Sequence, residues 1–304
     1  MKTRALSAIV CVMAAVNFAS ADTIRGINID FVTIGNPGNP GDTRPDSIVS
    51  QQGTTWYYAN PYGCGSVDYN YRIGKFEITA DQWETINSTA EIDDSTFGIG
   101  DQPVHGVSWY DAAEFCNYLT SGDKNLGAYQ IGTNGSITIA RQSAISTYGT
   151  IYVLPTEDEW YKAAYYTGSG YSLYANGADT APALDVESNY AHEGNYGDYS
   201  LPWDVGTGAM EQNGTFDMMG NVSEWTEAEH HEPGYRVHRG VASAYDFWNL
   251  DEIYGPSSIY RAGDYPYYED RGLVGFRVAS VPEPATLLLL GLGSLALLRK
   301  RKTV

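Results

Sequence analysis

The stretch from residue 166 to residue 280 limits the fold more than any other part of the chain. It is rich in Gly, Tyr, Asn and Asp and contains few continuous apolar runs. Long helices and fully buried strands need continuous or periodic apolar residues, so we expect short strands joined by long loops here. Such loops need a metal, a disulfide or tight aromatic packing to stay ordered. The 25 tyrosines and 7 tryptophans of the chain can supply the aromatic packing.

Two helices upstream of this stretch are predicted from their first turns. Ser108 and Asp111 have the spacing of a capping box, in which a hydroxyl caps the first turn and an acid three residues later caps it in return. Thr156 and Glu159 repeat the pattern. Each box precedes apolar residues at helical spacing, so a helix is expected after each of them.

The remaining elements are predicted from alternation and composition. Residues 22–34 alternate apolar and polar side chains, which predicts a strand, and the aromatic and β-branched run 69–79 predicts another. Residues 35–66 are rich in Gly, Pro and Asn and indicate a long loop, and 80–86 indicates a short helix. No fixed-period repeat or clean linker is present, so we expect one irregular, loop-rich α+β domain.

The first 21 residues have the order of a secretory signal peptide. Lys2 and Arg4 form a basic start, an uncharged and mostly apolar run follows, and small residues occupy positions 19–21. This order predicts export, with cleavage before Asp22. A buried N-terminal helix is the alternative.

The C-terminal segment 281–304 pairs a structure-breaking joint with a short apolar run. Pro282, Glu283 and Pro284 interrupt regular structure, residues 285–298 are apolar apart from one serine, and a basic cluster starts at Arg299. The apolar run would reach about 21 Å as a helix, short of the roughly 30 Å hydrocarbon core. We expect a transient inner-membrane anchor with its basic end in the cytoplasm. An ordinary tail anchor is the alternative.

The charge and the cysteines narrow the possible partners. The formal charge is −19, and subtracting the six basic residues of the two removable ends leaves about −25 for residues 22–284. Such a body is not expected to bind nucleic acid or anionic lipid. Cys64 and Cys116 remain after processing. They could form a disulfide in an exported protein, or stay as buried thiols.

Both the tail and the body resemble known families. The Pro-Glu-Pro tripeptide, the apolar run and the basic end resemble the PEP-CTERM sorting signal, which implies an exosortase-type enzyme as a partner. Segments within 67–280 are similar, in family order, to the formylglycine-generating enzyme, or sulfatase-modifying factor, family. They are residues 71–79, 102–112, 154–160, 216–225, 239–240 and 275–279. Ser223 stands where the family usually has Trp. The resemblance implies an irregular fold with a C-type-lectin-like core, preceded by an N-terminal strand and loop over 22–66.

The resemblance also bears on catalysis. Active members oxidise a substrate cysteine with two copper-binding cysteines that lie between the elements matched here by Arg239 and Arg277. This chain has no cysteine between those positions, and the family's cysteines would fall near Tyr245 and Leu250. We therefore expect no copper and no catalytic residue of the family type, although a substitute site built from distant residues stays open.

Calcium is the cofactor that the resemblance favours. The family's structural calcium ligands carry over to the Asp217 and Glu224 carboxylates and to the Gly220 and Val222 carbonyls. Oxygen ligands of this kind suit a hard cation. A second family site would fall on Asn189, Tyr190, Asp198 and Tyr199, although Gly197-Asp198 departs from the usual order. The alternative is that these side chains only hydrogen-bond their loops.

Two further groups of residues are candidates for binding. The first is Glu229-His230-His231-Glu232 with His238, which could hold a transition metal, but a solvated loop explains these residues as well. Tyrosines can offer flat faces to sugars or proteins, or can simply pack the core. The candidate faces are Tyr165, Tyr166, Tyr171, Tyr174 and the run 260–268.

Three functions follow from these observations. The first is a non-catalytic recognition or extracellular-matrix protein, with a surface polysaccharide or protein as its partner. The second is a metal-dependent oxidase of the same family with an altered active site. The third is a structural coat protein that calcium holds together.

Overall fold

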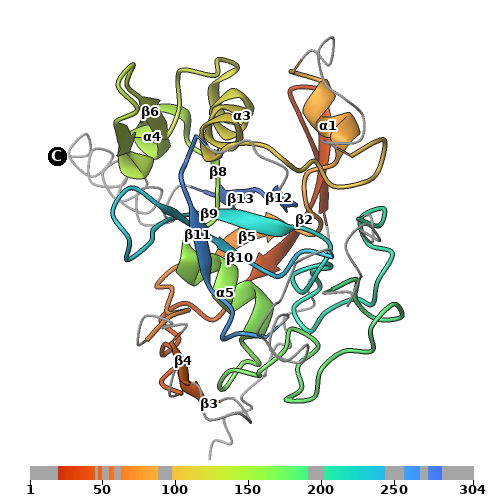
Figure 1. Cartoon of the computed structure of the whole chain (residues 1–304). Coiled ribbons are helices and arrows are strands. Elements are labelled where there is room, and N and C mark those ends of the chain that lie inside the picture. The colour runs from red at the N-terminus through yellow and green to blue at the C-terminus, as the bar shows by residue number, and fades with distance from the viewer. Residues whose placement is uncertain are drawn as a thin grey trace, which may run out of the picture.

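The computed structural model describes residues 20–44, 47–49, 55–57, 63–87, 98–190, 202–243, 257–267 and 273–282. Within these ranges, two sheets and two small hairpins are combined with short helices (Figure 1). The helices are α1 (Ala80–Glu84), α3 (Trp109–Ser121), α4 (Arg141–Tyr148) and α5 (Glu157–Tyr165). The two small hairpins are β3 (Ser47–Val49) with β4 (Thr55–Tyr57), and β6 (Tyr129–Ile131) with β7 (Ile137–Ile139).

The larger sheet has five strands in the order β1-β2-β5-β13-β8, and all of its neighbours are antiparallel. The strands are β1 (Ser20–Ile24), β2 (Ile27–Ile34), β5 (Tyr71–Gly74), β8 (Ile151–Val153) and β13 (Ala279–Val281). It therefore joins the N-terminal strands to the last described strand of the chain. The strand predicted at 22–34 belongs to this sheet.

The predicted strand 22–34 is in fact a hairpin. Arg25 and Gly26 both have positive φ, 51° and 89°. Two such residues make the tight turn whose twist matches a two-stranded ribbon. The prediction of one continuous strand was wrong. Arginine is an unusual residue for the first position of this turn, and the alternation of apolar and polar residues gives no sign of a turn at this point.

The predicted strand 69–79 is shorter than expected. β5 ends at Gly74, after which the backbone amide of Lys75 donates to the carbonyl of Asp30 and that of Ile78 to the carbonyl of Phe276. A side chain at Gly74 would put its Cβ 2.9 Å from the carbonyl oxygen of Phe76. The regular strand therefore ends at Gly74, although the chain beyond it keeps hydrogen bonds to β2 and to the segment before β13. A run of β-forming residues does not reveal this end.

The smaller sheet has four strands in the order β11-β10-β9-β12. They are β9 (Ser223–Glu229), β10 (Arg236–Arg239), β11 (Ala262–Asp264) and β12 (Val274–Gly275). Only the β12–β9 pair is parallel among these pairings. Short strands and long connections over 166–280 agree with the prediction, and the fold is an irregular, loop-rich α+β arrangement.

The helix starts were predicted correctly. Both predicted capping boxes form, with Ser108 capping α3 and Thr156 capping α5. The short helix expected at 80–86 is α1, which Thr79 starts with a third box. Helix α4 was not predicted, because Ala140 offers no side-chain cap and the helix buries only Ala144 and Ile145.

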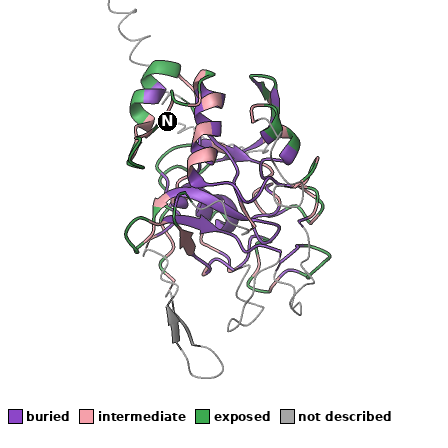
Figure 2. Cartoon of the chain, turned by 45° about the horizontal axis from the view of Figure 1, so that its top comes forward, coloured by how far each residue is buried: buried purple, intermediate pink, exposed green. Residues whose placement is uncertain are grey.

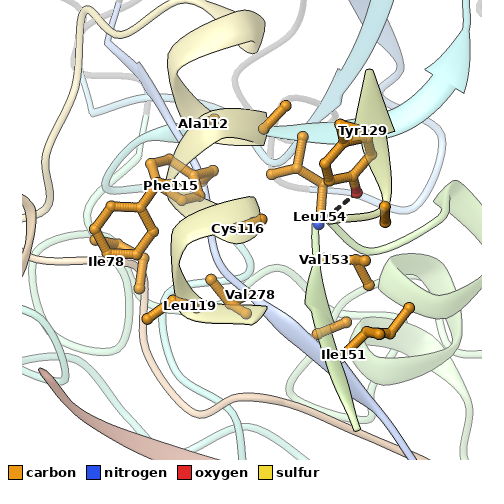
Figure 3. Packing of buried hydrophobic residues seen from close by; sticks show 14 of the residues in the cluster. Ile78, Ala112, Phe115, Cys116, Leu119, Tyr129, Ile151, Val153, Leu154 and Val278 are labelled. Carbon is orange, nitrogen blue, oxygen red and sulfur yellow. Dashed lines mark hydrogen bonds between the residues drawn. The ribbon is translucent and has the colours of Figure 1, made fainter. Parts of the chain in front are cut away.

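Two hydrophobic cores hold these elements together. In the first, Cys116 of α3 points toward Val153 and Leu154, whereas Phe115 lies on the other side of the helix, near Ile78 (Figure 3). The Phe115 ring stacks on Trp83 of α1, with ring centroids 5.6 Å apart. The hydroxyl of Tyr129 accepts from the Leu154 amide at 2.9 Å. The second core lies between α5, β5 and the segment around residues 174–175 and 218–219. Buried residues gather on the central strands, while exposed residues lie on outer turns and loops and on peripheral helices (Figure 2).

The two cysteines belong to different cores. Cys64 lies in the core with α5, Cys116 lies in the core with α3, and both are free and buried. The disulfide considered from the sequence is therefore not formed, because each thiol packs into its own cluster.

The described residues contain no helix that is both long enough and apolar enough to cross a membrane. Residues 283–304, including Glu283, Pro284 and Arg299 of the sorting segment, lie outside the described residues, whereas Pro282 is described and exposed.

Candidate functional site

The segment from Asp217 to Glu224 forms a tight loop that leads into β9. Asp217, Gly220 and Asn221 all have positive φ. A Cβ at Gly220 would lie 2.3 Å from the carbonyl oxygen of Asn189, so only glycine fits there. The Asn221 amide donates to that same carbonyl at 2.6 Å. The structure thus brings together the two segments that were expected, from the resemblance, to hold calcium.

Glu224 is held by a buried ion pair. Its two carboxylate oxygens accept from Nη2 and Nε of Arg277, both at 2.6 Å, and one of them also accepts from the Trp160 indole at 2.7 Å. Both charged side chains are fully buried. Arg277 further donates to the carbonyls of Gly74 and Phe216. This pair therefore ties the start of β9 to the end of β5.

Other acids are buried around the same arginine. Burial raises the pKa of Glu77 well above its usual value, and the neighbouring Asp217 and Glu224 raise it further. Burial likewise raises the pKa of Asp217 to about 6, although the Gly206 amide, which donates to it at 2.7 Å, opposes this. Burial raises the pKa of Glu211 to about 8, against the attraction of Arg277. The region therefore carries more carboxylates than Arg277 can neutralise.

The expected first calcium site can be compared with this geometry. Asp217 is a buried carboxylate whose raised pKa indicates that its ionised form lacks compensation, which fits a nearby cation. Glu224 is already paired with Arg277, although a carboxylate has lone pairs beyond those used here. The backbone of Gly220 and Val222 lies in the same loop. The donor chemistry fits an oxygen-liganded cation, with Arg277 as a competitor for Glu224.

The expected second site is described only in part. Asn189 and Tyr190 are buried, and Tyr190 donates its hydroxyl to the carbonyl of Pro182. Asp198 and Tyr199 lie outside the described residues. Across the part of the chain that the structure describes, no group of three or more His, Cys, Asp or Glu side chains forms a metal-binding cluster.

The thiols lie in environments that suppress their reactivity. Burial raises the pKa of Cys64 far above its usual value, with the Glu157 and Asp158 carboxylates adding to the shift and Arg239, 4.0 Å away, opposing it. Burial also raises the pKa of Cys116. Because the thiolate is the reactive form, this burial disfavours the reactive state of both residues in the folded protein. Tyr245 and Leu250, near the family's cysteine positions, lie outside the described residues.

The histidines near the β9–β10 turn do not converge. His230 and His231 lie on the turn, with ring centroids 4.0 Å apart, and Nδ1 of His230 accepts from the Glu232 amide. His238 is buried in β10, against the edge of Trp225. Among the described residues, these histidines belong to no group of three or more His, Cys, Asp or Glu side chains that could hold a metal ion.

A polar cleft that the sequence did not indicate lies beside the β1–β2 turn. It has a volume of about 530 Å³, and helix α1 and the loop at Asp204 form its other walls. Four aspartates and one aromatic ring line it: Asp30, Asp81, Asp101, Asp204 and Phe76. The loop at Asp204 continues to Gly206, whose amide donates a hydrogen bond to the Asp217 carboxylate. Four distant segments build the cleft, and no local motif in the sequence marks it.

The tyrosines divide into buried and exposed groups. Tyr165 at the end of α5 and Tyr174, both candidates for an exposed face, are buried in the second core. Tyr166 is also buried, and Tyr171 is half-buried against that core. Within the run 260–268, Tyr260 is buried, but Tyr265 and Tyr267 are 38% and 60% exposed. Tyr268 lies outside the described residues.

Comparison with known proteins gives two family matches. The sulfatase-modifying factor enzyme 1-like domain matches residues 45–281, and the PEP-CTERM protein-sorting motif matches residues 280–302. The chain is 30% identical over 186 residues to the chaperone protein LppX of Paenibacillus barcinonensis. That alignment covers 54% of this chain and 64% of LppX, so the chain spans less than two thirds of that relative.

Solved structures share the fold. Treponema denticola variable protein 1 superposes with a TM-score of 0.57 at 19% identity, covering 87% of this chain and 99% of that one. CarF gives 0.56 at 23% identity, with 84% and 99% covered, and PvdO from Pseudomonas aeruginosa gives 0.57 at 16% identity, with 88% and 99% covered. Sequence identities this low support a shared fold and no shared function. With the domain match spanning most of its length, the chain belongs to the family of sulfatase-modifying factor enzyme 1-like domains, and it carries a PEP-CTERM sorting motif.

Proposed function

We propose that this chain is a non-catalytic recognition domain that acts at the bacterial cell surface or in the extracellular matrix. The sorting motif supports export and surface sorting and implies processing by an exosortase-type enzyme. The observation that carries the non-catalytic role is the state of the thiols. Cys64 and Cys116 are buried with raised thiol pKa values, and no cysteine stands between Arg239 and Arg277.

Two further parts of the proposal concern calcium and the tail. Calcium would bind near Asp217 and Glu224, where buried carboxylates outnumber the charge of Arg277. Its role would be to order the loop before β9, with no part in a reaction. The apolar tail would hold the chain in the inner membrane until the sorting enzyme releases it.

The test combines thiol accessibility with an activity assay. Native protein, purified after export, should leave both thiols unmodified by an alkylating reagent, and denatured protein without reductant should expose both. Incubation with copper, oxygen and cysteine-containing peptides should yield no aldehyde product. Rapid alkylation of a native thiol, or peptide oxidation at a rate above that of free copper, would contradict the proposal.

Selective binding distinguishes the proposed recognition domain from the alternative, a structural coat protein. A purely structural protein would assemble without binding any one partner preferentially. A recognition domain should show saturable binding to a defined surface polymer or protein. Absence of saturable binding across both polysaccharides and surface proteins of the producing cell would favour the coat protein.

A further inference from the structure

Three tyrosines form an exposed stack at one edge of the smaller sheet. Tyr235 and Tyr265 have ring centroids 4.2 Å apart, and Tyr265 and Tyr267 have centroids 5.2 Å apart. Their rings are nearly parallel, at 27° and 17°. We call these three residues the tyrosine ledge. Tyr267 is the most exposed tyrosine among the large hydrophobic side chains that the structure describes.

Strand pairing builds the ledge. β10 and β11 pair antiparallel with Arg236 opposite Asp264, so the next positions outward are Tyr235 and Tyr265. The turn at residues 266 and 267, after the end of β11, places the Tyr267 ring against that of Tyr265. The carbonyl of Pro266 accepts from the Tyr110 amide at 3.4 Å and ties the ledge to the start of α3. The rings are therefore held in place before any ligand arrives.

Hydrogen-bonding groups surround the rings. Glu229 and Asp264 have side chains that are 80% and 41% exposed, and Glu232 and His231 are exposed on the adjoining turn. Tyr235 shares a hydrogen bond with Tyr265, and this bond raises the pKa of Tyr235 to about 12, because it favours the protonated phenol that donates. The ledge thus combines flat apolar faces with carboxylate acceptors and phenol groups at its rim.

We infer that the tyrosine ledge binds an uncharged polysaccharide, an inference that rests on the recognition role proposed above. Sugar rings have apolar C–H faces that stack on aromatic rings, and hydroxyls that donate to carboxylates. The body charge of about −25 repels anionic polymers. A protein partner fits less well, because the centres of protein interfaces are depleted of charged residues and three carboxylates border this ledge.

The experiment measures retention on immobilised uncharged polysaccharides. The probes are insoluble polymers of glucose, mannose, galactose and xylose, with alginate as an anionic comparison and polylysine as a cationic one. The wild-type protein, purified after export, should be retained by at least one uncharged polymer and not by alginate. The double variant Tyr265→Ala/Tyr267→Ala should lose about tenfold or more of that affinity.

Two further variants separate stacking from folding. Tyr265→Phe/Tyr267→Phe keeps the rings and should keep most of the affinity. Tyr148→Ala removes a tyrosine of similar exposure, 40%, at the end of α4 and should bind as the wild type does. The thermal midpoint of each variant shows whether it is folded.

The outcomes distinguish this inference from the broader proposal. Retention by no uncharged polymer, or equal retention of the wild type and the alanine double variant, overturns the ledge as the site. Retention by polylysine alone would assign the surface to a cationic partner and also overturn it. Saturable binding to a surface protein would then leave the recognition role standing, whereas peptide oxidation would remove it.

Discussion

At the scale of single residues, Glu224 and Arg277 form a fully buried ion pair. Two hydrogen bonds of 2.6 Å make the pair bidentate, and complete burial makes each partner depend on the other. Removing one partner of such a pair leaves an uncompensated buried charge, which is costlier than losing a surface ion pair. The fold therefore tolerates the pair only as a unit.

Arg277→Leu is expected to destabilise the protein by about 3–5 kcal/mol, because it leaves Glu224 charged and buried. Denaturant unfolding of the exported protein would measure the loss. Arg72→Ala is the matched control, since Arg72 pairs with Asp22 at the surface, and it should cost about 1 kcal/mol or less. Equal losses for the two variants would contradict this account.

Glu211 should make stability depend on pH. Burial raises its pKa from 4.5 to about 8, so the folded state holds a proton that the unfolded state releases. Its contribution to stability is full below about pH 4.5 and is lost as the pH rises through about 8, and the total loss is on the order of 5 kcal/mol.

Unfolding of the wild type and of Glu211→Gln, in chelator and between pH 5 and pH 9, would measure this. The glutamine mimics the protonated acid, keeps an acceptor for Thr215 and should reduce the slope of the profile to the part that Asp217 and Glu77 contribute. Glu84→Gln, at an exposed position of α1, should leave the profile unchanged. A glutamine variant with the wild-type slope would show that Glu211 ionises normally.

At the scale of elements, helix starts are set by local chemistry. Thr156 accepts from the Glu159 amide at 3.1 Å, and Glu159 accepts from the Thr156 amide at 2.7 Å. Thr156→Ala should therefore cost about 1 kcal/mol of stability. Ser146→Ala, which removes only a hydroxyl bonded back to the Gln142 carbonyl on exposed α4, should change it by a few tenths. A Thr156→Ala variant as stable as the Ser146→Ala variant would show that the cap is dispensable.

The same contrast explains what could be predicted from the sequence. The caps at Ser108 and Thr156 involve residues three apart in the sequence, so both helix starts could be predicted. The family could also be predicted, because several short motifs occur in the family's order. The turn at Arg25 was missed because its backbone conformation is unusual for that residue. The cleft lined by Asp30 and Asp204 was missed because tertiary pairing, and no local spacing, brings its walls together.

At the scale of the whole molecule, long connections are fixed by a few buried polar anchors. Arg239 pairs with Glu157, which also holds Arg261, while Arg141 joins Glu159 to Glu227. These links connect helix starts to strands far away in the sequence. A loop-rich fold with small cores thereby keeps its surface features, the cleft and the tyrosine ledge, in fixed positions.

The most direct test of the central claim is the metal content of the protein purified after export, with its thermal midpoint measured before and after chelation. The account predicts calcium at about one ion per chain or more, no copper, and a lower midpoint after chelation. Copper at about one ion per chain would contradict it, because a redox metal held by this fold would mark a working oxidase instead of a recognition domain.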